Sequence, residues 1–317
     1  MTLTSVEMCA GAGGQAIGLE QAGFDHEALV EIDQACCATL RLNRPQWMIH
    51  EGDLDAFSGK HFRGVDLLAG GLPCPPFSIA GKQLGAADER NLFPAALRLV
   101  DEIRPRALMI ENVRGFLGAV FEDYRDQLKG QLRKLGYVAD WRLLNASDFG
   151  VPQLRPRVVI VALRKESADQ FDWPSVQAHN PPTVGETLFD LMASRGWPGA
   201  AAWRNRANDI APTLVGGSKK HGGPDLGPTR AKRAWASMGV NGLGISDEPP
   251  GPDFVGMPKL DVRMVARLQG FPDTWQFAGR KTAAYRQVGN AFPPPVAQAV
   301  AAKLRAALTA RKVFAVA

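Results

Sequence analysis

Short apolar runs alternate with stretches of helical periodicity through the first half of this chain. The strand-like runs are at residues 5–9, 27–32, 65–69, 107–111 and 157–163. Helical patterns end at about residue 23 and extend over 34–43, 93–103 and 124–135. This alternation is typical of a sheet built from strand–helix–strand units. The pattern therefore predicts an α/β fold.

The pattern changes at residues 172–261, which are rich in proline, glycine and tryptophan and show little periodicity. Turn-forming dipeptides are frequent there, as is typical of irregular structure. Helical patterns return at 262–270 and again near 296–311. We expect a large domain formed by residues 1–171 and 262–317, with 172–261 as a smaller separate domain.

Composition narrows the class of protein. The 317 residues are 45% apolar and 22% charged, which is ordinary for a soluble globular protein and leaves room for two domains. No apolar run is long enough to span a membrane, and no basic-then-apolar signal peptide begins the sequence. The four cysteines form neither a disulfide framework nor a Cys-x-x-Cys pair, so we expect a cytoplasmic protein with no metal site.

Charge is uneven along the chain. The formal net charge is +5, yet residues 195–235 alone carry eight Lys or Arg against two Asp. A local excess of positive charge is the expected footprint of a polyanion-binding surface. A solvated surface without a partner explains the charge equally well.

The segment with the most chemical information follows the predicted strand at 65–69. It reads Gly70-Gly71-Leu72-Pro73-Cys74-Pro75-Pro76-Phe77-Ser78. Each proline fixes its own φ and restricts the residue before it, so Cys74 sits on a stiff loop at a strand end. Such a placement suits a nucleophile. A structural cysteine in a proline-rich turn is the alternative.

A glycine-rich turn follows the first predicted strand. Gly11-Ala12-Gly13-Gly14-Gln15-Ala16 fits the G-x-G-x-x-G/A pattern of nucleotide-binding turns, and Glu31 ends the second strand 20 residues after Gly11. Asp53 follows a third strand-like segment, where a carboxylate can accept a hydrogen bond from an adenine amine. Alone, these features fit NAD, FAD or S-adenosylmethionine, and a turn without a ligand remains an alternative.

Charged groups flank two other predicted strands. Glu111 comes after the apolar residues 107–110, at the carboxyl edge where α/β enzymes keep their sites. Arg155 and Arg157 alternate on an extended segment, so both are expected on one side, where they suit an anionic or carbonyl-bearing ligand. Helix capping and surface ion pairs are the competing interpretations. Residues 287–294 are expected to open the last helix, with prolines in its first turn.

Taken in order, these motifs resemble those of the cytosine-5 DNA methyltransferases of bacterial modification type. The most specific are Pro73-Cys74-Pro75-Pro76-Phe77-Ser78, Glu111-Asn112-Val113, Gln153-x-Arg155-x-Arg157 and Ala266-Arg267-Leu268-Gln269-Gly270-Phe271-Pro272. The resemblance covers nearly the whole chain. It implies a Rossmann-like, S-adenosylmethionine-dependent fold with a mixed sheet, helices on both faces and an irregular target-recognition domain at 172–261.

The resemblance also implies which residues bind S-adenosyl-L-methionine. They are Cys9, Ala10, Gly11, Gly13, Gly14, Glu31, Ile32, Asp53, Leu54, Pro73, Leu92, Asn290 and Ala291. Two positions depart from the family pattern. Cys9 stands where the family usually has a phenylalanine beside the cofactor, and residues 263–265 lack the usual Thr and Glu. We expect these departures to affect affinity more than activity.

By the family's chemistry, the Cys74 thiolate adds to carbon 6 of cytosine. Glu111 then hydrogen-bonds or protonates ring nitrogen 3, and Arg155 or Arg157 holds the carbonyl oxygen. Carbon 5 takes the methyl group and a base removes its proton, with no metal required. The target base must leave the duplex for this reaction. Residues 79–91, with glycines near both ends, are expected to close over it.

Double-stranded DNA is the implied partner. The residues expected to contact it are Ser78, Lys82, Thr213, Lys219, Lys220, Arg230, Lys232 and Arg233. We expect a monomer associated with the bacterial nucleoid, with a cognate restriction endonuclease as a further partner.

Three other functions remain open. A tRNA cytosine-5 methyltransferase of the same fold would carry a smaller recognition region than the roughly 90 residues found here. A catalytically inactive DNA-binding homologue would not need Cys74, Glu111 and both arginines. A nicotinamide or flavin oxidoreductase would leave Cys74 and its prolines unexplained.

Overall fold

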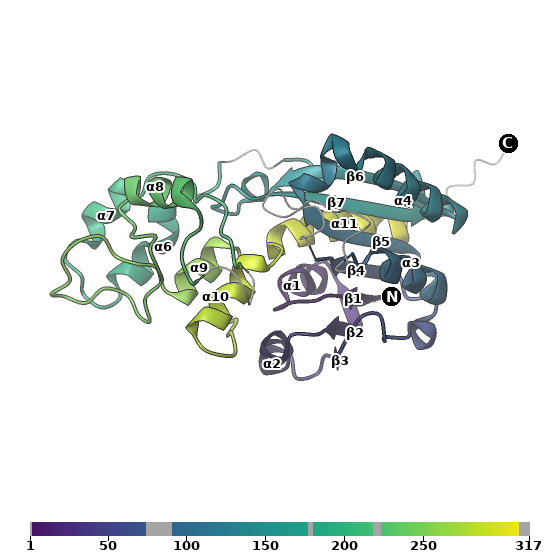
Figure 1. Ribbon diagram of the computed structural model, residues 1–317, viewed down its shortest axis with the longest axis horizontal. Coiled ribbons are helices and arrows are strands. Elements are labelled where there is room, and N and C mark those ends of the chain that lie inside the picture. Colours follow the sequence, from purple (N-terminus) through teal and green to yellow (C-terminus); the bar gives the residue numbers. More distant parts are fainter. Residues whose placement is uncertain (1, 74–90, 177–179, 218–222, 311–317) are drawn as a thin grey trace.

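The computed structural model describes residues 2–73, 91–176, 180–217 and 223–310 (Figure 1). Its centre is a seven-stranded sheet of order β3-β2-β1-β4-β5-β7-β6. In sequence order the strands are β1 (Leu3–Met8), β2 (Phe24–Glu31), β3 (Ile49–Glu51), β4 (Leu67–Gly71), β5 (Ala107–Val113), β6 (Tyr137–Asn145) and β7 (Pro156–Arg164).

The sheet is mixed, which confirms the predicted fold class. Strands β1 to β5 pair in parallel, whereas β7 is antiparallel to both β5 and β6. The parallel strands therefore end at one edge, and their carboxyl ends bring together residues far apart in the sequence. The direction of the strand order reverses between β1 and β4. A ligand-binding crevice is expected beside that point, at the carboxyl edge of the parallel strands.

Helices cover both faces of the sheet (Figure 1). Successive strand residues point to opposite faces. Val6, Leu68 and Ile110 pack with α3 (Phe93–Ile103) and α4 (Glu122–Lys134). On the other face, Leu67 and Met109 pack with α1 (Gly14–Gln21) and α11 (Pro294–Thr309).

The remaining helices are shorter or lie away from the sheet. They are α2 (Gln34–Asn43), α5 (Lys165–Ala168), α6 (Val184–Ala193), α7 (Ala200–Arg206), α8 (Thr229–Ser237), α9 (Val262–Leu268) and α10 (Lys281–Asn290). Figure 1 shows α6, α7 and α8 at one end of the molecule, with α9 and α10 between them and the sheet. A continuous core, including Trp203, Trp235 and Val288, joins these helices.

The sequence pattern located most of the elements of the sheet domain. The predicted helices at 34–43 and 93–103 coincide with α2 and α3. Strand β6 was not predicted, although its residues alternate, and the short helices α6, α7 and α8 were hidden by the poor periodicity of 172–261.

The expectation for residues 287–294 was wrong. Gln287 and Asn290 belong to the end of α10, and α11 begins separately at Pro294. Pro294 and Pro295 start the new helix because the first turn needs no amide donor from them. Within the described parts of the chain, no helix combines the length and apolar character that crossing a bilayer requires.

Candidate active site

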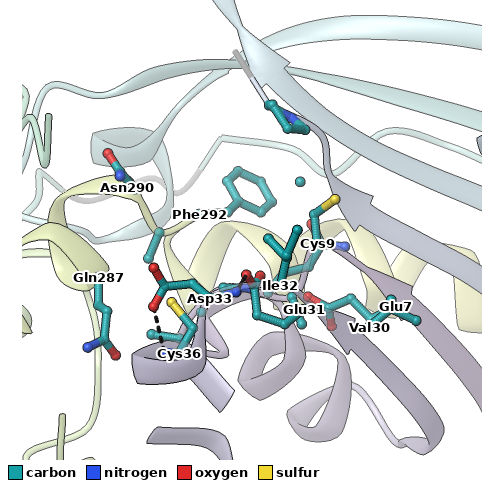
Figure 2. Close-up of a pocket in the computed structure, with 18 of the residues that line it drawn as sticks. Glu7, Cys9, Val30, Glu31, Ile32, Asp33, Cys36, Gln287, Asn290 and Phe292 are labelled. Atoms are coloured by element: carbon teal, nitrogen blue, oxygen red, sulfur yellow. Dashed lines mark hydrogen bonds between the residues drawn. The ribbon is translucent and has the colours of Figure 1, made fainter. Parts of the chain in front are cut away.

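A pocket of about 330 Å³ lies at the carboxyl edge of the parallel strands (Figure 2). Every residue expected to bind the cofactor lines it except Gly13. Glu111, on β5, lines the same pocket. The structure thus brings residues from five strand ends and from the segment after α10 to one cavity, whose volume lies in the range of ordinary small-molecule sites.

The glycine turn shapes one wall of this pocket. Cys9, Gly11 and Gly13 all have positive φ, at 50°, 54° and 88°. A Cβ on Gly13 would lie 2.9 Å from both Leu40 and Trp275. A Cβ on Gly14 would lie 2.3 Å from the Phe292 carbonyl oxygen. Gly13 therefore makes the turn possible without itself facing the cavity, while Gly14 allows the last segment to approach.

Glu31 fixes the turn from the neighbouring strand. Its carboxylate accepts hydrogen bonds from the amides of Gly11 and Asp33, each at 2.7 Å. Burial raises the pKa of Glu31, and these two donors oppose that effect. Asp53, which follows the neighbouring strand β3, is exposed and accepts a hydrogen bond from the Asp55 amide at 3.0 Å. The pocket therefore has both a buried and an exposed carboxylate.

Glu111 and Arg157 form a buried ion pair. The Arg157 Nε lies 2.7 Å from Glu111 Oε1, and the Glu111 side chain is 7% exposed. Burial raises the pKa of Glu111, with Arg157 and then Arg155 opposing the shift. The group is thus balanced between a carboxylate and a neutral acid that can donate a hydrogen bond.

The structure places Arg155 among backbone carbonyls. Its guanidinium is fully buried and donates to the carbonyls of Leu214, Gly289 and Ala291 at 2.6, 2.9 and 2.9 Å. The expectation that Arg155 or Arg157 holds the carbonyl oxygen of the substrate stays a prediction. Among the described residues, Arg155 donates to backbone oxygens and Arg157 forms the ion pair with Glu111.

Gln153 extends this internal network. Its amide donates to Gln269 Oε1 at 2.6 Å and its carbonyl oxygen accepts from the Leu214 amide at 2.9 Å. Gln269 in turn donates to the Ala291 carbonyl. The Gln-x-Arg segment thereby joins Leu214, near the middle of residues 172–261, to the wall of the pocket.

Two of the residues expected to contact DNA bond to other parts of the protein. Thr213 donates its hydroxyl to the Leu154 carbonyl, and Lys232 pairs with Asp225 at 2.7 Å. Arg230 and Arg233 are exposed on α8 and make no ion pair with any described residue. Cys74 and the expected DNA contacts Ser78, Lys82, Lys219 and Lys220 lie outside the described residues.

Glu7, Gln15, Arg286 and Phe292 are among the pocket residues that the sequence reasoning did not assign to the site. Figure 2 shows Phe292 contributing an aromatic ring to the wall that also includes Cys9. The aromatic group that is missing at Cys9 thus has a counterpart in the last segment. The one available signal for Glu7 was a carboxylate inside an apolar strand. Among the described residues, no group of three His, Cys, Asp or Glu side chains is arranged to hold a metal ion.

Comparison with known proteins gives one consistent family. The C-5 cytosine-specific DNA methylase family matches residues 3–306. The Type II methyltransferase M.NaeI of Lentzea aerocolonigenes is 58% identical over 313 residues, covering 97% of this chain and 76% of that protein. The Type II methyltransferase M.NgoMIV of Neisseria gonorrhoeae is 56% identical over 311 residues, covering 97% and 99%.

Solved structures share the fold at lower identity. A DNA modification methyltransferase encoded within an E. coli prophage has a TM-score of 0.67 at 23% identity, covering 96% of this chain and 99% of that one. The S. pombe Dnmt2 methyltransferase has a TM-score of 0.65 at 18% identity, covering 95% and 98%. These two likenesses concern the fold alone.

The network around Arg155 generates a prediction about stability. Arg155→Met removes the donors of three buried carbonyls, at about 1–3 kcal/mol for each group left unpaired. We expect the free energy of unfolding, measured by urea denaturation, to fall by at least about 3 kcal/mol. Arg233→Met, on the exposed face of α8, is the matched control and should change it by less than about 0.5 kcal/mol. Equal effects of the two substitutions would contradict the assignment.

Proposed function

Because this chain belongs to the C-5 cytosine-specific DNA methylase family, we propose that the pocket at its sheet edge holds S-adenosyl-L-methionine beside Cys74, Glu111 and Arg157. The protein is a DNA cytosine-5 methyltransferase whose relatives are Type II methyltransferases. The observation that carries the proposal is the Glu111–Arg157 pair on the wall of the glycine-turn pocket.

The chemistry of the pocket suits this cofactor. Glu31 stands at the end of β2, where a carboxylate can accept hydrogen bonds from ribose hydroxyls. Both side-chain polar atoms of Gln15, and Oε2 of Glu7, are buried without a hydrogen-bond partner among the described residues. Buried polar groups are nearly always paired, so these atoms suit a polar, charged ligand. When bound, S-adenosylmethionine supplies a methyl group activated by its sulfonium.

Catalysis begins with the Cys74 thiolate, which forms a bond to carbon 6 of the cytosine ring. Electron density then moves toward ring nitrogen 3, where Glu111 donates a hydrogen bond or a proton. Its raised pKa favours the protonated form that this step requires. Arg157, held against Glu111, is available to the carbonyl oxygen at position 2. Once carbon 5 has gained the methyl group, loss of its proton to a base expels Cys74 and restores the aromatic ring.

Residues 172–261 form the proposed target-recognition domain. Arg230 and Arg233 on α8 are exposed cations suited to phosphate contacts, as Lys219 and Lys220 are by their charge. Ser78, Lys82, Lys232 and Thr213 remain further proposals as DNA contacts. Extrusion of the target base from the duplex would bring carbon 6 within reach of Cys74, at a cost of a few kcal/mol.

The proposed function also implies where in the cell the protein acts. Acting on chromosomal DNA would place it with the nucleoid of a bacterial cell, as a monomer modifying one strand at a time. The names of the relatives indicate restriction–modification, so a cognate restriction endonuclease is the proposed cellular counterpart.

The direct test is methyl transfer from labelled S-adenosylmethionine. Wild type and Cys74→Ser are assayed on duplex DNA and on tRNA, followed by bisulfite sequencing of the DNA. We expect label in duplex DNA only, lost with Cys74→Ser because serine is a far poorer nucleophile at neutral pH. Label confined to tRNA would indicate an RNA enzyme, and no label on either would indicate an inactive homologue.

Phe292 provides a second prediction. Phe292→Ala removes the ring that this chain places on the pocket wall, where Cys9 offers little surface. Because Phe292 is only 5% exposed, its removal leaves a void in that wall, and S-adenosylmethionine binding should weaken about tenfold, measured by calorimetry. Phe254→Ala, on an exposed loop of the recognition domain, is the control and should leave the dissociation constant unchanged. An unaltered constant in Phe292→Ala would exclude the ring from the site.

A further inference from the structure

Glu7 is the most unusual buried group outside the residues already assigned. It lies on β1, is 1% exposed and lines the cofactor pocket (Figure 2). Its Oε2 has no hydrogen-bond partner within the described residues. A buried carboxylate without a partner is costly, so its position in a pocket wall indicates that a ligand supplies what the protein lacks.

The groups that face Glu7 are mostly acidic. Glu31 comes from β2, Asp53 follows β3, and Glu111, with Arg157, comes from β5 and β7. On β4 the residue opposite Glu7 is Ala69, which is uncharged. Three other titratable groups adjoin the same cavity: the thiols of Cys9 and Cys36 and the Asp33 carboxylate.

Arg286 on α10 is the one cationic side chain among the described residues that line the pocket. Burial and the Glu31 charge raise the pKa of Glu7 well above its ordinary range. Burial likewise raises the pKa of Cys9, which therefore stays a neutral thiol. The two amide donors of Glu31 oppose the rise that burial causes in its pKa. Of the carboxyl groups in this cavity, Glu7 is the one for which the described residues supply neither a donor to its Oε2 nor an ion-pair partner.

The methyl donor and its product differ in charge at one atom. S-adenosylmethionine carries a sulfonium, and transfer breaks the bond between sulfur and the methyl carbon. The bonding electrons remain on sulfur, which becomes a neutral thioether, and the proton from carbon 5 leaves to a base. The α-ammonium group is common to both molecules, so only the sulfonium charge distinguishes them.

We propose that Glu7 is a specificity-determining residue that senses this charge. It holds a proton while the pocket is empty, releases it to solvent when the sulfonium binds, and takes one up again when the thioether product remains. The inference rests on the proposed cofactor site. Glu7 would thus favour S-adenosylmethionine over the demethylated product and help the product to leave.

The pH dependence follows from the sign of this linkage. In the empty protein Glu7 is protonated up to its raised pKa, so binding the sulfonium must displace a proton. Affinity for S-adenosylmethionine should therefore rise with pH until Glu7 ionises in the free protein. Affinity for S-adenosylhomocysteine should lack this rise, because the neutral thioether does not favour the ionised carboxylate.

Isothermal titration calorimetry in two buffers of different ionisation enthalpy measures the protons released on binding. The ligands are S-adenosylmethionine, S-adenosylhomocysteine, and sinefungin, which carries an amine in place of the sulfonium. We expect proton release with the two cations and none with the thioether. Glu7→Gln should abolish the release and reduce the preference for S-adenosylmethionine over the thioether about tenfold, as one pKa unit of coupling requires. Glu27→Gln, an exposed carboxylate on β2, should behave as wild type.

The calorimetry distinguishes a failure of the inference about Glu7 from a failure of the proposed function. Binding of S-adenosylmethionine without proton release, or release that persists in Glu7→Gln, overturns the inference and leaves the proposed function intact. Failure of the wild type to bind S-adenosylmethionine at all overturns the proposed function itself.

Thermal unfolding of the empty protein is an independent check. In the unfolded chain Glu7 ionises near its ordinary pKa, while in the folded protein it keeps its proton. The folded wild type therefore loses stability as pH rises between those two pKa values. Glu7→Gln has no such loss, so its melting temperature should increase relative to wild type from about pH 5 to about pH 8. A difference that does not change with pH contradicts the proposal.

Discussion

The buried guanidinium of Arg155 is the constraint on which the rest of this site depends. It bonds to the Leu214 carbonyl, within residues 172–261, and to the Gly289 and Ala291 carbonyls beside the pocket. Two backbones approach closely at the same place: a Cβ on Gly289 would lie 2.4 Å from the Gly216 amide nitrogen. Arg155 therefore ties residues 172–261 to the wall of the pocket.

Residues 172–261, the proposed target-recognition domain, share a hydrophobic core with the helices beside the sheet. Helices α9 and α10 share a continuous core with α6 to α8. Asn290 and Ala291, which line the pocket, lie directly beyond this core. A displacement of the recognition domain would have to break the Arg155 bonds or carry the pocket wall with it.

The three glutamates that line the pocket differ in the groups that surround their carboxyl oxygens. Glu31 accepts hydrogen bonds from two amides, Glu111 pairs with an arginine, and Oε2 of Glu7 has no partner among the described residues. Different surroundings suit the same functional group to different tasks. The pair with Arg157 holds the buried Glu111 side chain at the wall of the pocket.

Much of the sheet domain could be predicted from sequence, because parallel strands place motif residues at one edge whatever the loops between them do. That rule located Glu31, Asp53 and Glu111 on a single pocket. The hydrogen-bond partners of Arg155 could not be predicted in this way. Alternation along a strand shows on which side of the strand a residue lies, but it does not identify the residue's partners. Those of Arg155 come from segments about 60 and 135 positions away in the sequence. The rule also missed Phe292, whose place in the pocket depends on how α10 ends and α11 begins.

The measurement that tests the account most directly uses duplex DNA with 5-fluorocytosine at the methylated position found by bisulfite sequencing. Fluorine at carbon 5 cannot leave as a proton, so a cysteine that has bonded to carbon 6 stays attached after methyl transfer. We predict a covalent protein–DNA complex that forms only with S-adenosylmethionine and maps by mass spectrometry to the peptide containing Cys74. An adduct on another residue, or none despite normal methylation of unmodified DNA, would contradict the account.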